Sequence, residues 1–99
     1  MKTSITNVEF AGEIIRYATI AKDFYIKANK EDNLDAKYHL INSCTGFLKQ
    51  TRDLVSAMFF VSMITGSEFS ILFKAVNKEF SDDYIQNLIQ AFKECGIDV

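Results

Sequence analysis

Apolar residues recur along the chain at alternating intervals of four and three, the spacing that places side chains on one face of an α-helix. The first such series extends over Phe10–Ala28, and a second apolar row lies beside it. Just before the series, Thr6 and Glu9 have the spacing of a capping box, in which each side chain accepts a hydrogen bond from the backbone N–H of the other. The pattern therefore predicts a helix over about 7–29 with a broad apolar face.

A longer series follows a polar segment and predicts the second helix. Its apolar positions extend over Leu40–Val61 with the same spacing. Either Asp32 or Asn33 is suited to cap its start, and Thr65–Gly66 is expected to stop it, which places the helix over about 34–64. Gly46 lies in its middle, and glycine is a local cause of helix bending, so the sequence leaves open whether this helix is continuous.

Two shorter helices are expected in the last third of the chain. Ser67 is suited to cap a helix over about 68–78. Ser81 and the two aspartates that follow it predict another over about 82–95, because acidic residues favour the first turn of a helix. Gly96 suits the left-handed residue after its end, and Ile97 would then meet Phe92 as in a Schellman motif.

These elements predict an all-α fold with a single domain over residues 1–99. Short connections make consecutive helices antiparallel neighbours, so we expect a small up-and-down bundle in which two shorter helices cover a long helical hairpin. The composition agrees, because a chain of 99 residues with 48% hydrophobic residues, no Pro and four Gly is typical of a compact helical globule.

Charge and targeting signals narrow the classes of partner. The net charge of −2 gives no strong field toward phosphate backbones, so nucleic acid is not an expected partner. The dense apolar run Leu54–Ile64 is too short to span a bilayer. Cys44 and Cys95 lack metal-type spacing, and the first residues do not resemble a secretory leader, so we expect free thiols and a cytoplasmic location.

The sequence offers little for catalysis, and we expect no enzymatic activity, cofactor or metal site. His39 is the only histidine. Asp35, His39 and Ser43 follow one another at intervals of four, formally an acid, a base and a hydroxyl nucleophile. Side chains spaced in this way stack along one rod rather than converge on a substrate, so a polar strip is the simpler interpretation.

The leading functional hypothesis is a small protein-interaction module, acting as an inhibitor, adaptor or regulator. The C-terminal half of the second predicted helix is apolar almost all round, which is more than a small bundle needs and favours a homodimer or an exposed interaction patch. Abundant Lys, Asn, Ile and Phe are typical of AT-rich bacterial or phage genomes, in which small accessory proteins are common. The expected interaction residues are Leu54, Val55, Met58, Phe59, Phe60, Phe69 and Phe73.

The alternative hypothesis is an oligomer that sequesters a nucleotide or a similar flat anion. Aromatic and basic side chains gather around the first helical hairpin, and tyrosine together with Arg or Lys can stack on and clamp such a ligand. The residues expected to bind it are Arg16, Tyr17, Lys22, Tyr25 and Tyr38.

Overall fold

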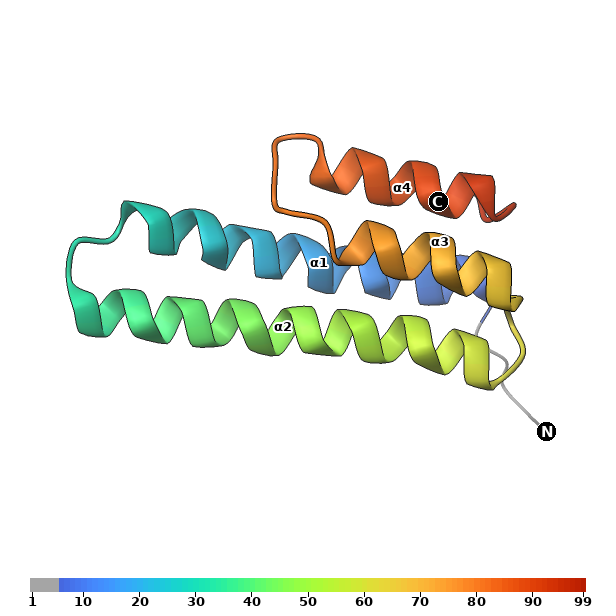
Figure 1. Cartoon of the computed structure of the whole chain (residues 1–99), viewed down its shortest axis with the longest axis horizontal. Coiled ribbons are helices and arrows are strands. Elements are labelled where there is room, and N and C mark those ends of the chain that lie inside the picture. The colour runs from blue at the N-terminus through green and yellow to red at the C-terminus, as the bar shows by residue number, and fades with distance from the viewer. Residues whose placement is uncertain (1–5) are drawn as a thin grey trace.

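The structure, a computed structural model, describes residues 6–99, and in these the chain forms four α-helices joined by short connections (Figure 1). This confirms the predicted all-α bundle, in which two long helices form a hairpin and two shorter helices lie over it. The helices are α1 (Asn7–Lys30), α2 (Leu34–Phe60), α3 (Gly66–Val76) and α4 (Tyr84–Glu94).

The starts of α1 and α2 follow the predicted caps. The Thr6 hydroxyl accepts from the Glu9 backbone N–H at 3.1 Å, and the Glu9 carboxylate accepts from that of Thr6 at 3.2 Å, which is the expected capping box. At the start of α2, the side-chain oxygen of Asn33 accepts from the Ala36 backbone N–H at 2.9 Å, so Asn33 is the cap rather than Asp32. The helix then continues through Gly46 without a break.

The end of α2 differs from the prediction, because the helix stops at Phe60 rather than near residue 64. Ser62 adopts a left-handed backbone conformation with φ of 62°. The Met63 backbone N–H donates to the Met58 carbonyl at 2.8 Å, and that of Ser62 donates to the Phe59 carbonyl at 3.0 Å. These two bonds form a Schellman motif, so α2 is terminated by a serine in the position that usually holds glycine.

The starts of α3 and α4 also differ from the prediction. Thr65, not Ser67, caps α3, and it forms a second capping box with Glu68. Asp83 is the N-cap residue of α4 but its side chain makes no capping bond, so Asp82 and Asp83 precede the helix rather than occupy its first turn. The end of α4 is as predicted: Gly96 has φ of 77°, and the Ile97 N–H donates to the Phe92 carbonyl at 2.9 Å.

The two long helices pack along their length, with small residues at the buried face of α1. Four of its five buried residues are alanines, and small side chains let the neighbouring elements approach closely. Beside them, the Phe47 ring of α2 stacks on Tyr17 and Phe24 of α1, with ring centroids 5.9 and 5.8 Å apart. The largest fully buried side chains are Tyr84, Phe92, Ile14, Met58, Leu72, Leu88, Val55 and Val76.

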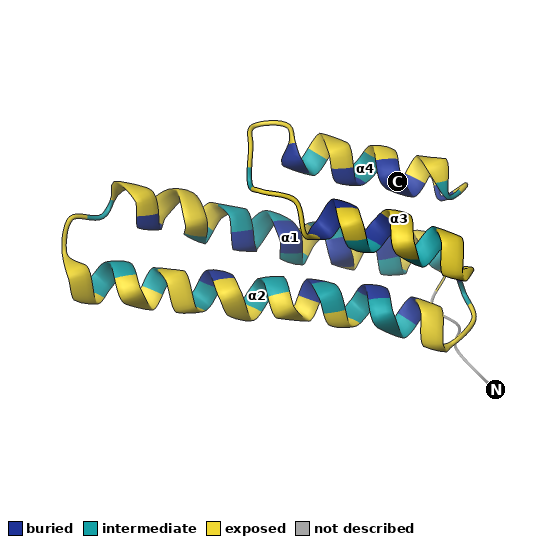
Figure 2. Ribbon diagram, in the orientation of Figure 1, coloured by how far each residue is buried: buried dark blue, intermediate teal, exposed yellow. Residues whose placement is uncertain are grey.

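The two short helices cover only one part of the hairpin. Figure 2 shows buried residues concentrated where α3 and α4 lie, whereas the end of the hairpin near the α1–α2 connection is mostly exposed or half-buried. The α3–α4 connection forms the edge of the covered part. There Phe80 packs on Tyr25 with ring centroids 5.2 Å apart, and the Lys22 ammonium donates to the Asp82 carbonyl at 3.4 Å. The short helices therefore end partway along the hairpin, at the α3–α4 connection. We call this boundary between the covered and the less covered half the step.

Candidate interaction surface

The structure divides the apolar segment at the end of α2 into core and surface residues. Val55 and Met58 are fully buried in the main core, and Leu54 is half-buried against it. Phe59 and Phe60, in contrast, are exposed on the last turn of the helix. Val55 and Met58 therefore contribute to folding and are not available for contact with a partner, although their sequence pattern resembles that of their exposed neighbours.

Five apolar residues form one continuous surface where α2 meets α3, which we call the aromatic corner. It consists of Phe59, Phe60 and Val61 from the end of α2 and of Phe69 and Phe73 from α3. The exposed fraction is 81% for Phe60, 62% for Val61 and 39% for Phe59, while the two α3 residues are half-buried. Val61 was not among the residues expected from the sequence, although it lies within the same apolar run.

The four rings of the aromatic corner contact one another in a row that leads from the core to the solvent. Ring centroids are 5.1 Å apart for Phe73 and Phe69, 5.1 Å for Phe69 and Phe59, and 6.0 Å for Phe59 and Phe60. Phe69 and Phe73 also pack against the main core. The exposed end of the row is thus supported by rings fixed within the fold, and such preorganisation lowers the entropy lost on binding.

The turn that carries the aromatic corner is held by several hydrogen bonds. The Schellman motif at Ser62 and the capping box between Thr65 and Glu68 lie within a few residues of each other. The Asn7 side-chain amide donates to the Met63 carbonyl at 3.4 Å, which attaches the turn to the start of α1. Ile64, at the centre of the turn, is buried. The corner is therefore a defined structural feature and not a loose loop.

The part of the aromatic corner that comes from the end of α2 lies in an uncharged segment. The segment Leu54–Ser67 contains no Asp, Glu, Lys or Arg, and it is bounded by the acidic residues Asp53 and Glu68. Ser62, Thr65 and Ser67 are exposed beside the rings and add hydroxyl groups at the edge. Protein–protein interfaces have the same composition: their buried centre is apolar and poor in charged residues, and their rim is polar.

The residues expected to bind a flat anion are engaged in contacts within the fold. The Arg16 guanidinium lies 4.7 Å from the Tyr17 ring centroid and is paired with the Glu13 carboxylate at 2.7 Å. The hydrogen bond and charge of Glu13 raise the pKa of Arg16. Tyr17 also lines a hollow of about 240 Å³ with Leu54 and two polar residues of α2, Gln50 and Asp53.

The other members of that set contact different parts of the molecule. Lys22 and Tyr25 contact the α3–α4 connection, through Asp82 and Phe80. Tyr38 lies near the start of α2 and is 63% exposed. The structure thus pairs Arg16 with Tyr17, and it places Lys22 and Tyr25 at one connection, but these contacts do not join the five side chains in one site.

The polar strip of α2 keeps the arrangement expected from its spacing. Asp35 and His39 are exposed and Ser43 is half-buried, all three on the same helix. His39 makes an edge contact with the Tyr38 ring at a centroid distance of 6.1 Å. Within residues 6–99 the structure gathers no group of three or more His, Cys, Asp or Glu side chains that could hold a metal ion.

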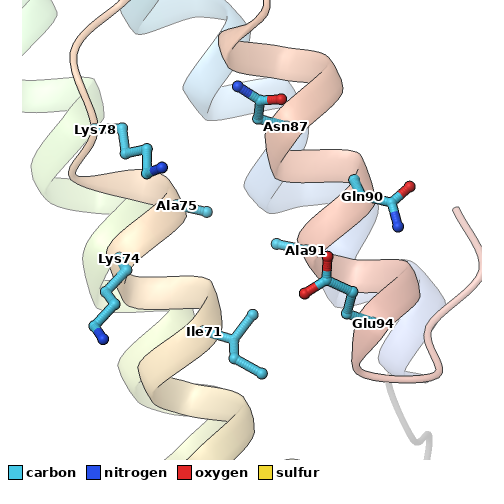
Figure 3. Close-up of a pocket in the computed structure, with 8 residues that line it drawn as sticks. All are labelled: Ile71, Lys74, Ala75, Lys78, Asn87, Gln90, Ala91 and Glu94. Carbon is cyan, nitrogen blue, oxygen red and sulfur yellow. The ribbon is translucent and has the colours of Figure 1, made fainter.

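A groove between α3 and α4, which the sequence pattern did not indicate, has a volume of about 400 Å³ (Figure 3). Its floor is apolar and shallow because Ala75 and Ala91 face each other across it, with Ile71 beside them. On the α3 side the groove is lined by Lys74 and by Lys78, which lies just after the helix. The α4 rim is formed by Asn87, Gln90 and Glu94.

Both cysteines are free thiols in the described part of the chain. Burial raises the pKa of the Cys44 thiol, and burial followed by the nearby carboxylates of Glu68 and Glu94 raises that of Cys95. Raised values disfavour the reactive thiolate, so neither thiol has the environment of an activated nucleophile. In the same part of the chain, every helix is too short or too polar to cross a bilayer.

Searches against protein-family models, curated proteins and solved structures gave no match to this chain.

Proposed function

We propose that this protein acts without catalysis, by binding another protein through the aromatic corner, and that it serves as an inhibitor, adaptor or regulator. The observation that carries the proposal is the row of four phenylalanine rings that leads from the core to the almost fully exposed Phe60. Burying one phenylalanine side chain contributes about 1.5–3 kcal/mol, so a partner that covers Phe60 and Val61 gains a substantial contact.

The rigidity of the turn supports this proposal. Interfaces are dominated by a few aromatic residues that fit into pockets of the partner, and these residues bind best when their position is fixed beforehand. Phe60 is the last residue of α2, a helix that ends in a hydrogen-bonded motif, and its neighbour Phe59 packs against Phe69 of α3. A rigid, protruding aromatic residue is suited to insertion into a pocket of a folded protein.

The charge around the aromatic corner favours a protein over a membrane surface. Segments that bind anionic lipid headgroups combine apolar residues with Lys or Arg on the flanking polar face. Here the charged residues that bound the uncharged segment are Asp53 and Glu68, both acidic, and on the α3 side of the corner the acidic Glu68 precedes Phe69 while the basic Lys74 follows Phe73. We propose a cytoplasmic location and a homodimeric state for the active protein, and an origin as a bacterial or phage accessory factor.

The experiment that tests the proposal compares captured proteins between two variants. The chain is expressed with an affinity tag in its native host as the wild type, as Phe60→Glu, and as Ile26→Glu, which alters an exposed apolar residue of α1. We expect one host protein to be retained by the wild type and by Ile26→Glu and lost with Phe60→Glu. The purified pair should then bind at least about tenfold more weakly with Phe60→Glu, a difference of about 1.4 kcal/mol.

Two results would count against the proposed function. The first is a captured protein that binds equally well to Phe60→Glu, because the aromatic corner would then not be the contact. The second is full biological activity of the Phe60→Glu variant with its fold intact. Circular dichroism of each variant shows whether the helices are retained, so loss of binding is not confused with unfolding.

Sequestration of a nucleotide-like anion stays as the second hypothesis. Its residues Arg16, Tyr17, Lys22 and Tyr25 are engaged within the fold, so a ligand would have to displace Glu13 from Arg16 or bind on the outer face of Tyr17. A gently purified sample that carries nucleobase absorbance, and loses it in Arg16→Ala with Tyr25→Ala, would favour this hypothesis over the first.

A further inference from the structure

The less covered half of the hairpin carries an exposed apolar stripe on α2. Leu34, Tyr38 and Ile41 follow one another at intervals of four and three and are 80%, 63% and 46% exposed. Three large apolar residues exposed on one side of a helix mark a contact surface more often than scattered single residues do. We call these three residues the apolar stripe.

The apolar stripe lies on the side of α2 that carries α3 further along the helix. Five turns of an α-helix take about 18 residues, the interval that separates Leu34 from Arg52 and Ile41 from Phe59. Arg52 donates to the side-chain oxygen of Asn77, just after α3, at 3.2 Å, and Phe59 packs on Phe69 of α3. The side of α2 that carries the apolar stripe is therefore covered by α3 in one half and, in the described chain, left exposed in the other.

We propose that a second copy of this chain covers the apolar stripe, with the α3–α4 groove of each copy receiving the stripe of the other. A two-fold axis across the step of the molecule places the short-helix layer of one copy over the less covered half of its partner. The exposed part of α2 before Cys44, about 15 Å long, matches α4, about 16 Å. The same two-fold operation makes the reverse contact, so the interface is closed and self-complementary.

The chemistry of the two surfaces is complementary in this arrangement. The groove has an apolar floor at Ile71, Ala75 and Ala91, where the small alanines leave room for a large side chain such as Ile41 or Tyr38 of the partner subunit. The two-fold axis makes α2 of one copy antiparallel to α4 of the other. The start of α2 therefore lies over the end of the partner's α4, because each is the part of its helix farthest from the step (Figure 1). Lys37, which lies beside the stripe next to Tyr38, therefore meets Glu94 of the partner subunit.

The area is sufficient for a dimer of moderate stability. Each contact between the α3–α4 layer of one copy and the less covered half of the other's hairpin is about 15 Å long and about two helices, or 20 Å, wide. The two-fold axis doubles this contact, so each copy loses about 600 Å² of accessible surface. The total of about 1,200 Å² is at the lower end of stable protein–protein interfaces.

The test measures the dimer dissociation constant by sedimentation equilibrium over about a hundredfold range of concentration. We expect the wild type to dimerise and Tyr38→Glu to weaken the dimer at least about tenfold, because a carboxylate would be buried on an apolar floor. Val8→Glu and Phe60→Glu, both at exposed apolar positions away from the stripe and the groove, serve as controls and should dimerise like the wild type.

A charge exchange tests the geometry rather than the presence of a dimer. Lys37→Glu alone places two carboxylates together and should weaken the dimer about three- to tenfold, and Lys37→Glu combined with Glu94→Lys should restore it. A monomeric wild type over the whole range would overturn the proposal. So would a dimer that is lost with Phe60→Glu but kept with Tyr38→Glu, or a double variant no tighter than Lys37→Glu alone.

The outcome is separable from that of the proposed function. A chain that stays monomeric but still binds its protein partner through Phe60 overturns only the dimer. A chain that dimerises through the stripe but captures no protein in a Phe60-dependent manner overturns only the proposed function.

Discussion

Met58 and Phe60 are separated by one residue in the apolar end of α2, and the structure gives them opposite roles. Met58 is 0% exposed within the main core, whereas Phe60 is 81% exposed. Replacing each with alanine therefore separates the part of this segment that stabilises the fold from the part that is free to bind. We predict a large loss of stability for Met58→Ala and almost none for Phe60→Ala.

The size of the Met58 effect follows from its burial. Alanine removes three heavy atoms from the core, and at about 0.8 kcal/mol per buried methylene-sized group this costs about 2.4 kcal/mol. A residual cavity of about 40 Å³ adds about 1 kcal/mol. The expected loss of about 3.4 kcal/mol would lower the melting temperature by about 15–25 °C in a domain of this size. Phe60→Ala, at an exposed position, should change the free energy of unfolding by less than about 0.5 kcal/mol.

The assay is urea or thermal unfolding followed by helical circular dichroism. It is performed at two protein concentrations, because dimerisation would add to the apparent stability of every variant. If Phe60→Ala were as destabilising as Met58→Ala, the exposed Phe60 would have a structural role and the aromatic corner would not be a free surface. If Met58→Ala had no effect, the division of this segment between core and surface would be wrong.

Three further predictions concern the turns and the core. Ser62→Gly should stabilise the protein by about 0.5–1 kcal/mol in urea unfolding, because glycine adopts the left-handed conformation at the end of α2 without steric strain. Gly96→Ala should destabilise by about 1 kcal/mol in the same assay, because the Schellman motif after α4 needs a positive φ there. Burial raises the pKa of Tyr84 to about 12 from 10.0, so the stabilising effect of its protonated form is fully present below about pH 10. About 2–3 kcal/mol should be lost as the pH rises from about 10 to about 12. Tyr84→Phe should remove that part of the pH dependence and, by leaving the Val76 carbonyl without its 2.7 Å bond, cost about 1 kcal/mol at neutral pH.

The helices were largely predictable because their signals are local. The capping box of Thr6 and Glu9 and the Schellman motif at Gly96 each depend on residues within a few positions of one another. The end of α2 was not predictable by the same rules, because Ser62 takes a backbone conformation that rules based on residue type assign to glycine. The steric cost of this conformation is offset by the packing of the turn, where Ile64 is buried. That packing exists only in the folded chain and is not visible in the local sequence.

The candidate site was predictable only in part, because periodicity shows that a helix face is apolar but not whether another element covers it. Phe59, Phe60, Phe69 and Phe73 were expected to act together, and the structure does bring them into contact. Val55 and Met58 have the same pattern and are buried, since their side of α2 faces the core.

The apolar stripe was missed for the same reason. Leu34, Tyr38 and Ile41 have the spacing of a buried helix face, and nothing near them in the sequence shows that α3 and α4 are too short to reach them. Which half of the hairpin is covered depends on the position of the short helices, and that position results from tertiary packing. The burial of these three residues depends on that position, so it cannot be predicted from the apolar pattern of α2 alone.

Binding of a protein partner at the aromatic corner can be detected directly by site-specific photo-crosslinking in the native host, with a benzophenone side chain in place of Phe60 or, as the control, of Ile26. If the aromatic corner binds a protein partner, position 60 gives one discrete crosslinked product with another protein and position 26 gives none of the same mass. Equal products from both positions, or no crosslink to another protein from position 60 in the folded chain, would contradict the claim that the aromatic corner binds a protein partner.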